Sequence, residues 1–176
     1  MRITISGPPG SGTTSLARLL AQREGMELVS AGEMFRQLAK ERNMDLSELG
    51  KLAENDTSID ALIDVRQKEI ARTKDNIILE GRLSGWMVED ANLKIWLTAS
   101  LGCRAKRIAQ RDGVDEYSAR MQTISRESCE SRRYRNYYGI DIRDLSPYHL
   151  ILNSELWNPE QLGGIVGLAI SYLKKR

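Results

Sequence analysis

A glycine-rich loop between a predicted strand and a predicted helix constrains the fold of this chain more than any other feature. Residues 3–6 form an apolar run, residues 7–15 read GPPGSGTTS, and a helical pattern follows. Glycines at positions 7, 10 and 12 let successive backbone N–H groups point inward, and the helix directs its positive N-terminal end at the same place. The loop therefore predicts a polyphosphate-binding site. The alternative, a turn without a ligand, fits this order of strand, loop and helix less well.

The loop matches the pattern G-x-x-x-x-G-K-S/T at every position except one. Thr13 stands where the lysine is expected, and Thr14 falls on the hydroxyl position that ligates Mg²⁺. Losing one charge-stabilising donor of this kind typically costs about 3 kcal/mol of transition-state stabilisation. We therefore expect a different cation to act there, and Arg126, Arg132 or Arg133, delivered by closure of a covering segment, are the candidates.

The order of apolar patterns predicts an α/β fold. Strand-like runs occur at residues 3–6, 27–30, 76–80, 93–98 and 148–153. Helical patterns cover residues 14–24, 31–42, 46–55, 59–73, 101–110, 117–137 and 159–175. Alternation of strands and helices predicts a single domain over residues 1–176, with a five-stranded parallel sheet covered by helices on both faces. Ligands of such sheets bind where the carboxyl ends of the strands meet.

Composition excludes several functional classes. The 26 basic and 24 acidic residues are too balanced for a protein whose main partner is nucleic acid. Cys103 and Cys129 are isolated and indicate free thiols in a reducing compartment. The first strand leaves no room for a signal peptide, and no apolar stretch is long enough to span a bilayer. We expect a cytoplasmic monomer without a stable nucleic-acid or membrane partner.

Polar residues follow the second and third predicted strands. Ser30 is placed to cap the next helix, and Arg36 lies one and a half turns further on. Glu80 ends the third strand, where it can reach a metal ion through water, and Arg82 projects over the sheet edge. Arg36 and Arg82 therefore indicate two clamps for a second phosphate. Residues 115–143 are long, polar, rich in arginine and without a strand, which is typical of a mobile cover.

These motifs together resemble the nucleoside monophosphate kinase family, and within it the archaeal-type cytidylate kinases. The likeness includes the loop, SAGEMFR at residues 30–36, LEGR at residues 79–82, CRA at residues 103–105 and YYGID at residues 137–141. It implies a P-loop kinase fold with a monophosphate-binding helical lobe at residues 31–73 and a short arginine-rich lid at residues 115–143. It also implies ATP and CMP, with dCMP, as substrates, and Mg²⁺ as cofactor.

The resemblance also assigns roles to individual residues. Thr14 and Glu80 would serve the metal ion, and Thr13, Arg126 and Arg133 would serve catalysis. The ATP site would comprise Gly7, Pro8, Pro9, Gly10, Ser11, Gly12, Thr13, Thr14 and Ser15, with Arg111 as a candidate contact at the hinge of the lid. The CMP site would comprise Ser30, Arg36, Arg82, Glu130 and Arg133. Asp56, Asp60 and Asp64 recur at fourfold spacing and are candidates for the nucleoside pocket, with Asp60 counted in the CMP site; a solvated helical face is the alternative.

Base recognition is predicted on the late helix. Arg126, Glu130 and Arg133 are four and three residues apart, so both arginines are expected to flank the carboxylate on one helix face. A carboxylate beside a guanidinium complements the amino group and ring acceptors of cytosine, whereas it repels the oxygen of uracil. The alternative for Glu130 is a surface ion pair on a solvated helix. Leu83 stands where bacterial cytidylate kinases usually carry an acid, so their base contacts do not transfer directly.

The predicted reaction is transfer of the γ-phosphoryl group of ATP to CMP without a covalent enzyme intermediate. Two alternatives stay open at this point. The acceptor can instead be AMP, UMP or an alcohol such as shikimate. A nucleotide-binding switch or RNA-associated factor with weak transfer activity is the other alternative, favoured by Thr13 and opposed by the two phosphate clamps, Arg36 and Arg82.

Overall fold

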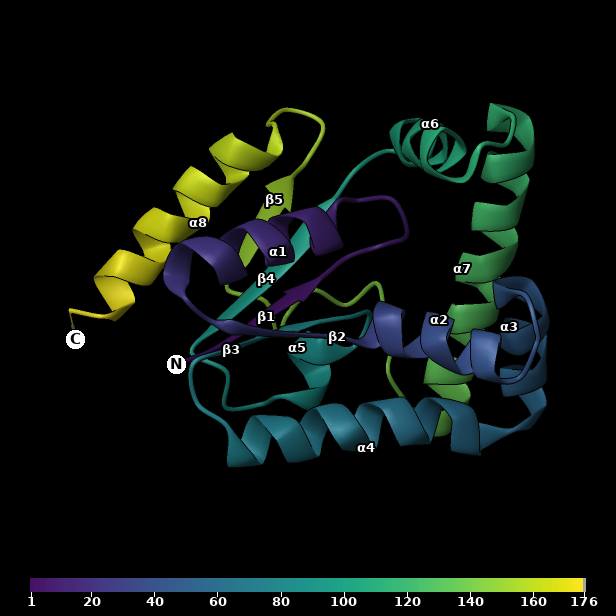
Figure 1. Ribbon diagram of the computed structural model, residues 1–176, viewed down its shortest axis with the longest axis horizontal. Coiled ribbons are helices and arrows are strands. Elements are labelled where there is room, and N and C mark those ends of the chain that lie inside the picture. Colours follow the sequence, from purple (N-terminus) through teal and green to yellow (C-terminus); the bar gives the residue numbers. More distant parts are fainter. Residues whose placement is uncertain (176) are drawn as a thin grey trace.

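The computed structural model describes residues 1–175, apart from the side chains of residues 54 and 57. Its elements alternate between strands and helices along the chain (Figure 1). In order they are β1 (Arg2–Ser6), α1 (Thr13–Glu24), β2 (Glu27–Ser30), α2 (Ala31–Glu41), α3 (Leu46–Asn55), α4 (Thr57–Thr73), β3 (Ile77–Glu80), α5 (Ser84–Met87), β4 (Leu93–Thr98), α6 (Leu101–Asp112), α7 (Glu116–Tyr138), β5 (Leu150–Asn153) and α8 (Pro159–Leu173).

The five strands form one parallel sheet in the order β2-β3-β1-β4-β5, which confirms the predicted fold class. Helices α1 and α8 cover one face, where Ile3, Ile5 and Leu97 enter the main apolar core. The other face carries Ile77 and Leu79, which pack with residues of α4 and of the segment after α5. Because both faces are buried, the central strands are apolar at nearly every position.

Local sequence signals set the ends of the helices. Ser30, Asp45, Asp115 and Asn158 each accept a hydrogen bond from the backbone N–H three residues later, as helix caps do. Gly139 ends α7 with φ +67°, in the left-handed region that favours glycine. The long, polar α7 therefore begins and ends within one residue of the predicted helix at residues 117–137.

The helix α5 and the reason for the glycines in α8 could not be predicted from the sequence. The short helix α5 was not expected, because a single turn leaves no periodic pattern; Gly85 allows it to pack directly against Tyr148, whose ring a Cβ would strike. The glycines of α8 also differ from one another. A Cβ on Gly163 would lie 2.7 Å from atoms of Leu19 and Arg23, whereas Gly164 faces open space. Close packing of α8 on α1 therefore explains Gly163 and not Gly164.

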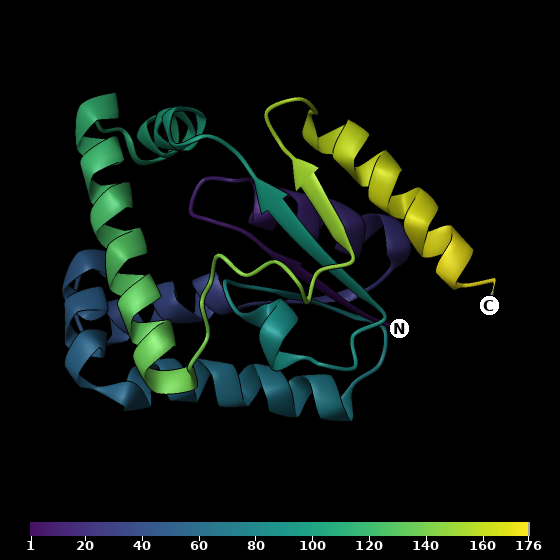
Figure 2. The same cartoon turned by 180° about the vertical axis from the view of Figure 1, so that it is seen from behind.

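Helix α7 stands beside the sheet and spans from α6 to α3, in both views (Figures 1 and 2). Helices α2 and α3 and the start of α4 enclose their own apolar cluster, with Leu49 and Ile59 fully buried. The Tyr137 hydroxyl on α7 donates to Ala53 O at 3.0 Å. This places α7 across the carboxyl end of the sheet. Within residues 1–175, no helix combines the length and apolar character needed to cross a bilayer.

Candidate active site

The loop between β1 and α1 leaves backbone donors free at the carboxyl end of the sheet. The Ser11 N–H donates to Pro8 O at 3.1 Å, and Gly10 and Gly12 have φ values of +79° and +92°, which favour glycine. Within the described chain, no side chain caps the start of α1, and its first turn carries no acid. The first N–H groups of this helix are therefore available to an anion.

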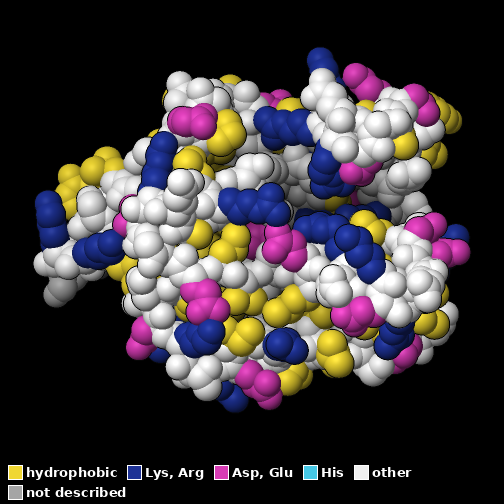
Figure 3. Space-filling model, in the orientation of Figure 1, with side chains coloured by type: hydrophobic (Ala, Val, Ile, Leu, Met, Phe, Trp, Pro, Cys, Tyr) yellow, Lys and Arg dark blue, Asp and Glu magenta, His cyan; other side chains and the backbone are white. Residues whose placement is uncertain are grey.

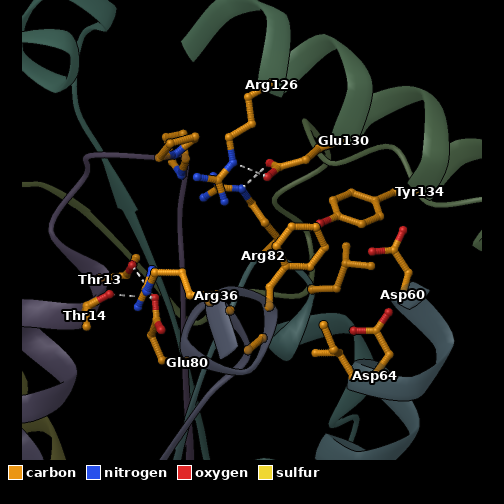
Figure 4. Close-up of a pocket in the computed structure, with 18 of the residues that line it drawn as sticks. Thr13, Thr14, Arg36, Asp60, Asp64, Glu80, Arg82, Arg126, Glu130 and Tyr134 are labelled. Carbon is orange, nitrogen blue, oxygen red and sulfur yellow. Dashed lines mark hydrogen bonds and ion pairs between the residues drawn. The ribbon is translucent and has the colours of Figure 1, made fainter. Parts of the chain in front are cut away.

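Glu80, at the end of β3, binds three hydroxyl groups, of which those of Thr13 and Thr14 lie at the start of α1 (Figure 4) and the third lies at the start of α2. Its carboxylate accepts hydrogen bonds from Thr13 Oγ1 at 2.6 Å, from Thr14 Oγ1 at 3.3 Å and from Ser30 Oγ. Glu80 is 6% exposed. The Ser30 hydroxyl also accepts from Glu33 N at 3.2 Å, so the predicted CMP contact Ser30 is occupied with Glu80 and with the cap of α2.

The oxygen atoms around Glu80 suit a magnesium ion. Mg²⁺ prefers hydroxyl, carboxylate, phosphate and water oxygens and commonly takes only one or two carboxylates from the protein. The Thr14 hydroxyl and the Glu80 carboxylate supply such a set. Among the described residues, no three histidine, cysteine or acidic side chains gather into a complete metal site. The donor set at Thr14 and Glu80 therefore fits an ion that arrives with a polyphosphate.

Glu130 on α7 holds two arginines beside the loop (Figure 4). Its carboxylate accepts from Arg82 Nε at 2.6 Å and from Arg126 Nε at 2.8 Å. Arg82 also donates to the carbonyl of Gly7 in the loop. Burial raises the pKa of Glu130, but the guanidinium groups of Arg82 and Arg126 outweigh this effect and lower it to about 2. The side chain is thus a fixed negative charge that orients two guanidinium groups.

Arg133 does not flank Glu130, so that part of the prediction is wrong. Its Nε lies 2.8 Å from Asp60 Oδ2, and its Nη1 donates to Gly50 O at 2.9 Å. Both side chains of the Asp60–Arg133 pair are buried, at 7% and 5% exposed. The position of Arg133 on α7 allows its side chain to reach either Glu130 or α4, and it pairs with the buried carboxylate of Asp60 on α4. Arg82 instead binds the second oxygen of Glu130.

Two of the three arginines expected to replace the missing lysine lie away from the loop. Arg132 is exposed and donates to Ser128 Oγ at 2.8 Å, and Arg133 faces α3 and α4. Of the three predicted candidates, only Arg126 reaches the Arg82 end of the cavity. Arg82, which donates to Gly7 O, and Arg126, which shares Glu130 with it, are therefore two of the cations that the structure places near the lysine-deficient loop.

A cavity beside the loop is surrounded by five arginines. Loop residues 8–10, α2, α4 and α7 line it, together with Glu80, Gly81 and Arg82. Its arginines are Arg36, Arg82, Arg111, Arg126 and Arg133, and its carboxylates are Asp60, Asp64, Glu80 and Glu130. Lys and Arg side chains gather around the hollow between α6 and α2 (Figure 3). Such a ring of guanidinium groups suits a small anion.

Arg36 and Arg111 occupy different parts of this cavity. Within the described chain, the Arg36 guanidinium has no hydrogen-bond or ion-pair partner, and it extends toward Thr13 and Glu80 (Figure 4). Arg111 is 58% exposed, at the rim, and binds its neighbour Asp112 at 2.7 Å. Arg36 is thus a free cation aimed into the cavity, whereas Arg111 is a contact at the edge.

The far end of the cavity is built by α4 and α7. Asp60 and Asp64 line it, while Asp56 instead caps α4 by accepting from Ser58 N at 2.9 Å. Burial raises the pKa of Asp64 to about 6, although the Tyr138 hydroxyl, which donates to it at 2.7 Å, acts in the opposite direction. Tyr138 was missed in the sequence, where only its place two turns after Glu130 hinted at a shared helix face.

A second cavity of about 410 Å³ lies on the other side of the loop. Ser11, Gly12 and Ser15 form one wall, and the segment from Ser154 to Pro159 forms another. Arg107 fixes that segment by donating to Ser154 Oγ at 2.9 Å and to Ser154 O at 2.7 Å. Trp157 lines this cavity too and was given no role in the sequence analysis. The loop therefore lies between two cavities: Gly10, Thr13 and Thr14 line the first, and Ser11, Gly12 and Ser15 line the second.

Relatives of known identity fit this geometry. The cytidylate kinase of Methanoregula boonei is 61% identical over 176 residues, which cover 99% of this chain and 97% of that protein. The cytidylate kinase of Methanoculleus marisnigri is 62% identical over 176 residues, with 100% and 97% covered. These two relatives span the whole region that carries the loop, both cavities and α7.

Solved structures share the fold at low sequence identity. Shikimate kinase from Bacteroides thetaiotaomicron superposes with a TM-score of 0.62 at 14% identity, over 99% of this chain and 98% of that one. A protein from Eubacterium ventriosum gives a TM-score of 0.70 at 20% identity, over 100% and 99%. The model of the cytidylate kinase-like family matches residues 2–156. With these matches and two archaeal relatives near 60% identity, the chain belongs to the cytidylate kinase-like family.

Proposed function

We propose that this protein transfers the γ-phosphoryl group of ATP to the 5′-phosphate of CMP, and of dCMP as well, giving ADP and the nucleoside diphosphate. The observation that carries the proposal is the convergence of Arg36, Arg82 and Arg126 on a cavity that adjoins the phosphate-binding loop. A nucleotide switch has no need of an acceptor site of this kind. The relatives named cytidylate kinase support CMP as the acceptor.

The donor nucleotide would bind across the loop. Its phosphates would accept hydrogen bonds from the N–H groups of residues 7–15, and its base end would occupy the second cavity, beside Arg107 and Trp157. Thr14 and Glu80 would hold Mg²⁺, which when bound neutralises phosphate charge. Thr13 fixes Glu80 by its 2.6 Å hydrogen bond, which gives the residue in the lysine position a positioning role.

The acceptor phosphate would lie between Arg36 and Arg82. It is already a nucleophile, so the protein has to hold two anions in line, neutralise their repulsion and exclude water. Arg82 and Arg126 stand beside the loop on the fixed charge of Glu130, and together they would supply the cation that Thr13 does not. Glu130 thereby acts through the two arginines that it orients.

The cytosine base would be recognised at the other end of the cavity. Asp60 and Arg133 form a buried pair there, and a carboxylate beside a guanidinium matches the amino donor and ring acceptors of cytosine. Uracil would place an oxygen against the Asp60 carboxylate and leave an acceptor unpaired. This assignment moves base selection from Glu130, where the sequence suggested it, to Asp60.

Residues 31–73 would form the monophosphate-binding lobe and residues 115–143 the lid of a monomeric enzyme. Helix α7 contacts α3 through Tyr137 and Arg133, so closing the lid would bring the two cavities together under one helix. Closure around bound nucleotides would exclude water from the phosphates.

Incubating the purified protein with ATP, Mg²⁺ and one acceptor at a time, and measuring ADP release, tests this proposal. We expect the highest kcat/KM with CMP, substantial turnover with dCMP, and far lower values with UMP, AMP and shikimate. Turnover with AMP and none with CMP would overturn the substrate. Absence of turnover with every acceptor would overturn the kinase itself.

A further inference from the structure

Two carboxylates on α7 each hold an arginine that donates to a carbonyl of the phosphate-binding loop. Glu130 holds Arg82, which donates to Gly7 O. Glu127, one turn earlier, holds Arg104, whose Nη1 lies 3.1 Å from Pro9 O. The first bridge belongs to the cavity described above. In the second, neither Arg104 nor Glu127 lines either cavity, and neither is among the proposed contacts with nucleotide.

The Arg104 guanidinium joins three separate segments. Besides Pro9, its Nε donates to Ala99 O at 3.0 Å, at the end of β4. Its Nη1 and Nη2 both reach the Glu127 carboxylate, the latter at 3.4 Å. The side chain is only 8% exposed, against 33% for Glu127. A buried guanidinium needs a counter-charge, so Glu127 fixes α7 against the underside of the loop.

The loop also packs directly on the backbone of Arg104. A Cβ on Gly10 would lie 2.7 Å from Arg104 O and 3.1 Å from its Cα, so the loop and the backbone of α6 are in close contact at this point. Less than two turns after Glu127, the same helix α7 reaches the acceptor side through Arg133, which contacts Asp60 and Gly50 O. Through Arg104, Glu127 therefore links α7 to the loop, and Arg133 links the same helix to the nucleoside end of the cavity.

We infer that Arg104 and Glu127 are positioning residues that couple the phosphate-binding loop to α7, and thereby couple ATP binding to CMP binding. The inference rests on the proposed function for the identity of the two ligands. A ligand on the loop favours one placement of α7 through Arg104 and Glu127, and a ligand beside Arg133 favours the same placement. Because such coupling is reciprocal, each nucleotide raises the affinity for the other by the same factor.

Calorimetric titration of CMP, with and without a saturating non-hydrolysable ATP analogue and with Mg²⁺ present throughout, measures this coupling. We expect wild-type protein to bind CMP about tenfold more tightly with the analogue, within the roughly 5- to 150-fold range of coupled sites. In Glu127→Gln the factor should fall to about two or less, while CMP alone binds within about twofold of wild type, because no CMP contact is altered. Arg104→Lys, which keeps the charge and loses the fork, should retain an intermediate factor.

Two exposed positions provide matched controls. Glu116→Gln removes a carboxylate from the first turn of α7, and Lys106→Gln removes a cation from α6; both side chains face solvent. Both variants should keep the wild-type coupling factor. If Glu127→Gln does not fold, as judged by its circular dichroism, Glu127→Asp keeps the charge, shortens its reach and should lower the factor as well.

The outcomes separate this inference from the proposed function. A wild-type protein that turns over CMP but shows no coupling, or a folded Glu127 variant that keeps the wild-type factor, overturns the inference alone. A wild-type protein that turns over no CMP overturns the proposed function, and with it the choice of ligands. A purely structural role for the pair would lower the melting temperature and leave the ratio of the two CMP affinities unchanged.

Discussion

Replacing Glu130 by glutamine removes the charge that orients Arg82 and Arg126. A carboxyl pKa held at about 2 instead of 4.5 corresponds to about 3 kcal/mol in favour of the charged form. Arg82 is 13% exposed and loses its counter-charge, whereas Arg126 is 43% exposed and can turn to water. We therefore expect a loss of about 2–3 kcal/mol in the free energy of unfolding, toward the lower limit for breaking a buried pair.

Two assays measure this effect. The melting temperature should fall by roughly 4–12 °C, since 1 kcal/mol is worth about 2–4 °C in a domain of this size. With CMP, kcat/KM should fall by about 10²-fold, the usual effect of misplacing a charge-stabilising donor. The pKa of Glu130 is lowered in the folded state, so its stabilisation is complete above about pH 4.5 and is lost as the pH falls through about 2. The stability difference between the two proteins should therefore be constant from pH 5 to 8.

Arg135→Gln is the control, because Arg135 lies on the same helix but pairs with Asp141 at the surface. It should leave kcat/KM unchanged. If Glu130→Gln melts early and yet turns over CMP at the wild-type rate, the pair of arginines is structural, and the proposed replacement of the lysine is refuted.

Three further perturbations give expected outcomes. Thr13→Val keeps the shape but loses the hydrogen bond to Glu80, so kcat should fall about 5- to 10-fold and more Mg²⁺ should be needed for half-maximal rate; an unchanged Mg²⁺ titration would argue against the positioning role. The pKa of Asp64 is raised to about 6, so ionising this carboxyl destabilises the folded state progressively as the pH rises from 3.8 through 6. Asp64→Asn should therefore raise the free energy of unfolding at pH 7 by up to about 3 kcal/mol, and in urea titrations that free energy should depend less on pH between 4 and 6 than it does in wild type. The same pH dependence in both proteins would contradict this. Gly164→Ala should stabilise α8 by up to about 1 kcal/mol, whereas Gly163→Ala should destabilise it against Leu19; thermal melts that rank them in the opposite order would refute the packing account.

The fold was predictable because its signals are local. The glycines of the loop, the apolar runs of the strands and the caps at Ser30 and Asp115 each act within a few residues, so their spacing is visible in the sequence. The helix α5 lacks such a signal, since four residues cannot show a helical period. Its place depends on the contact between Gly85 and Tyr148, which are distant in the chain.

The partners of the arginines were less predictable. Spacing puts Arg126 and Arg133 within reach of Glu130, but it cannot show that Arg82, two residues after β3, pairs with it or that Asp60 lies buried on α4. The partners of Arg104 could not be predicted for the same reason, because they come from three separate segments. Ion pairs between distant elements depend on how the elements pack, and the sequence pattern shows only which residues share a helix face.

Steady-state turnover of CMP by four proteins tests the central claim most directly: wild type, Thr13→Lys, Arg126→Gln and the double variant. If Arg126 supplies the charge that the loop lacks, a lysine restored at position 13 should make it less important. We predict that the fold loss of kcat caused by Arg126→Gln is at least about ten times smaller in the Thr13→Lys background than in wild type. An equal loss in both backgrounds would contradict the account, since it would mean that Arg126 and the missing lysine do not share a task.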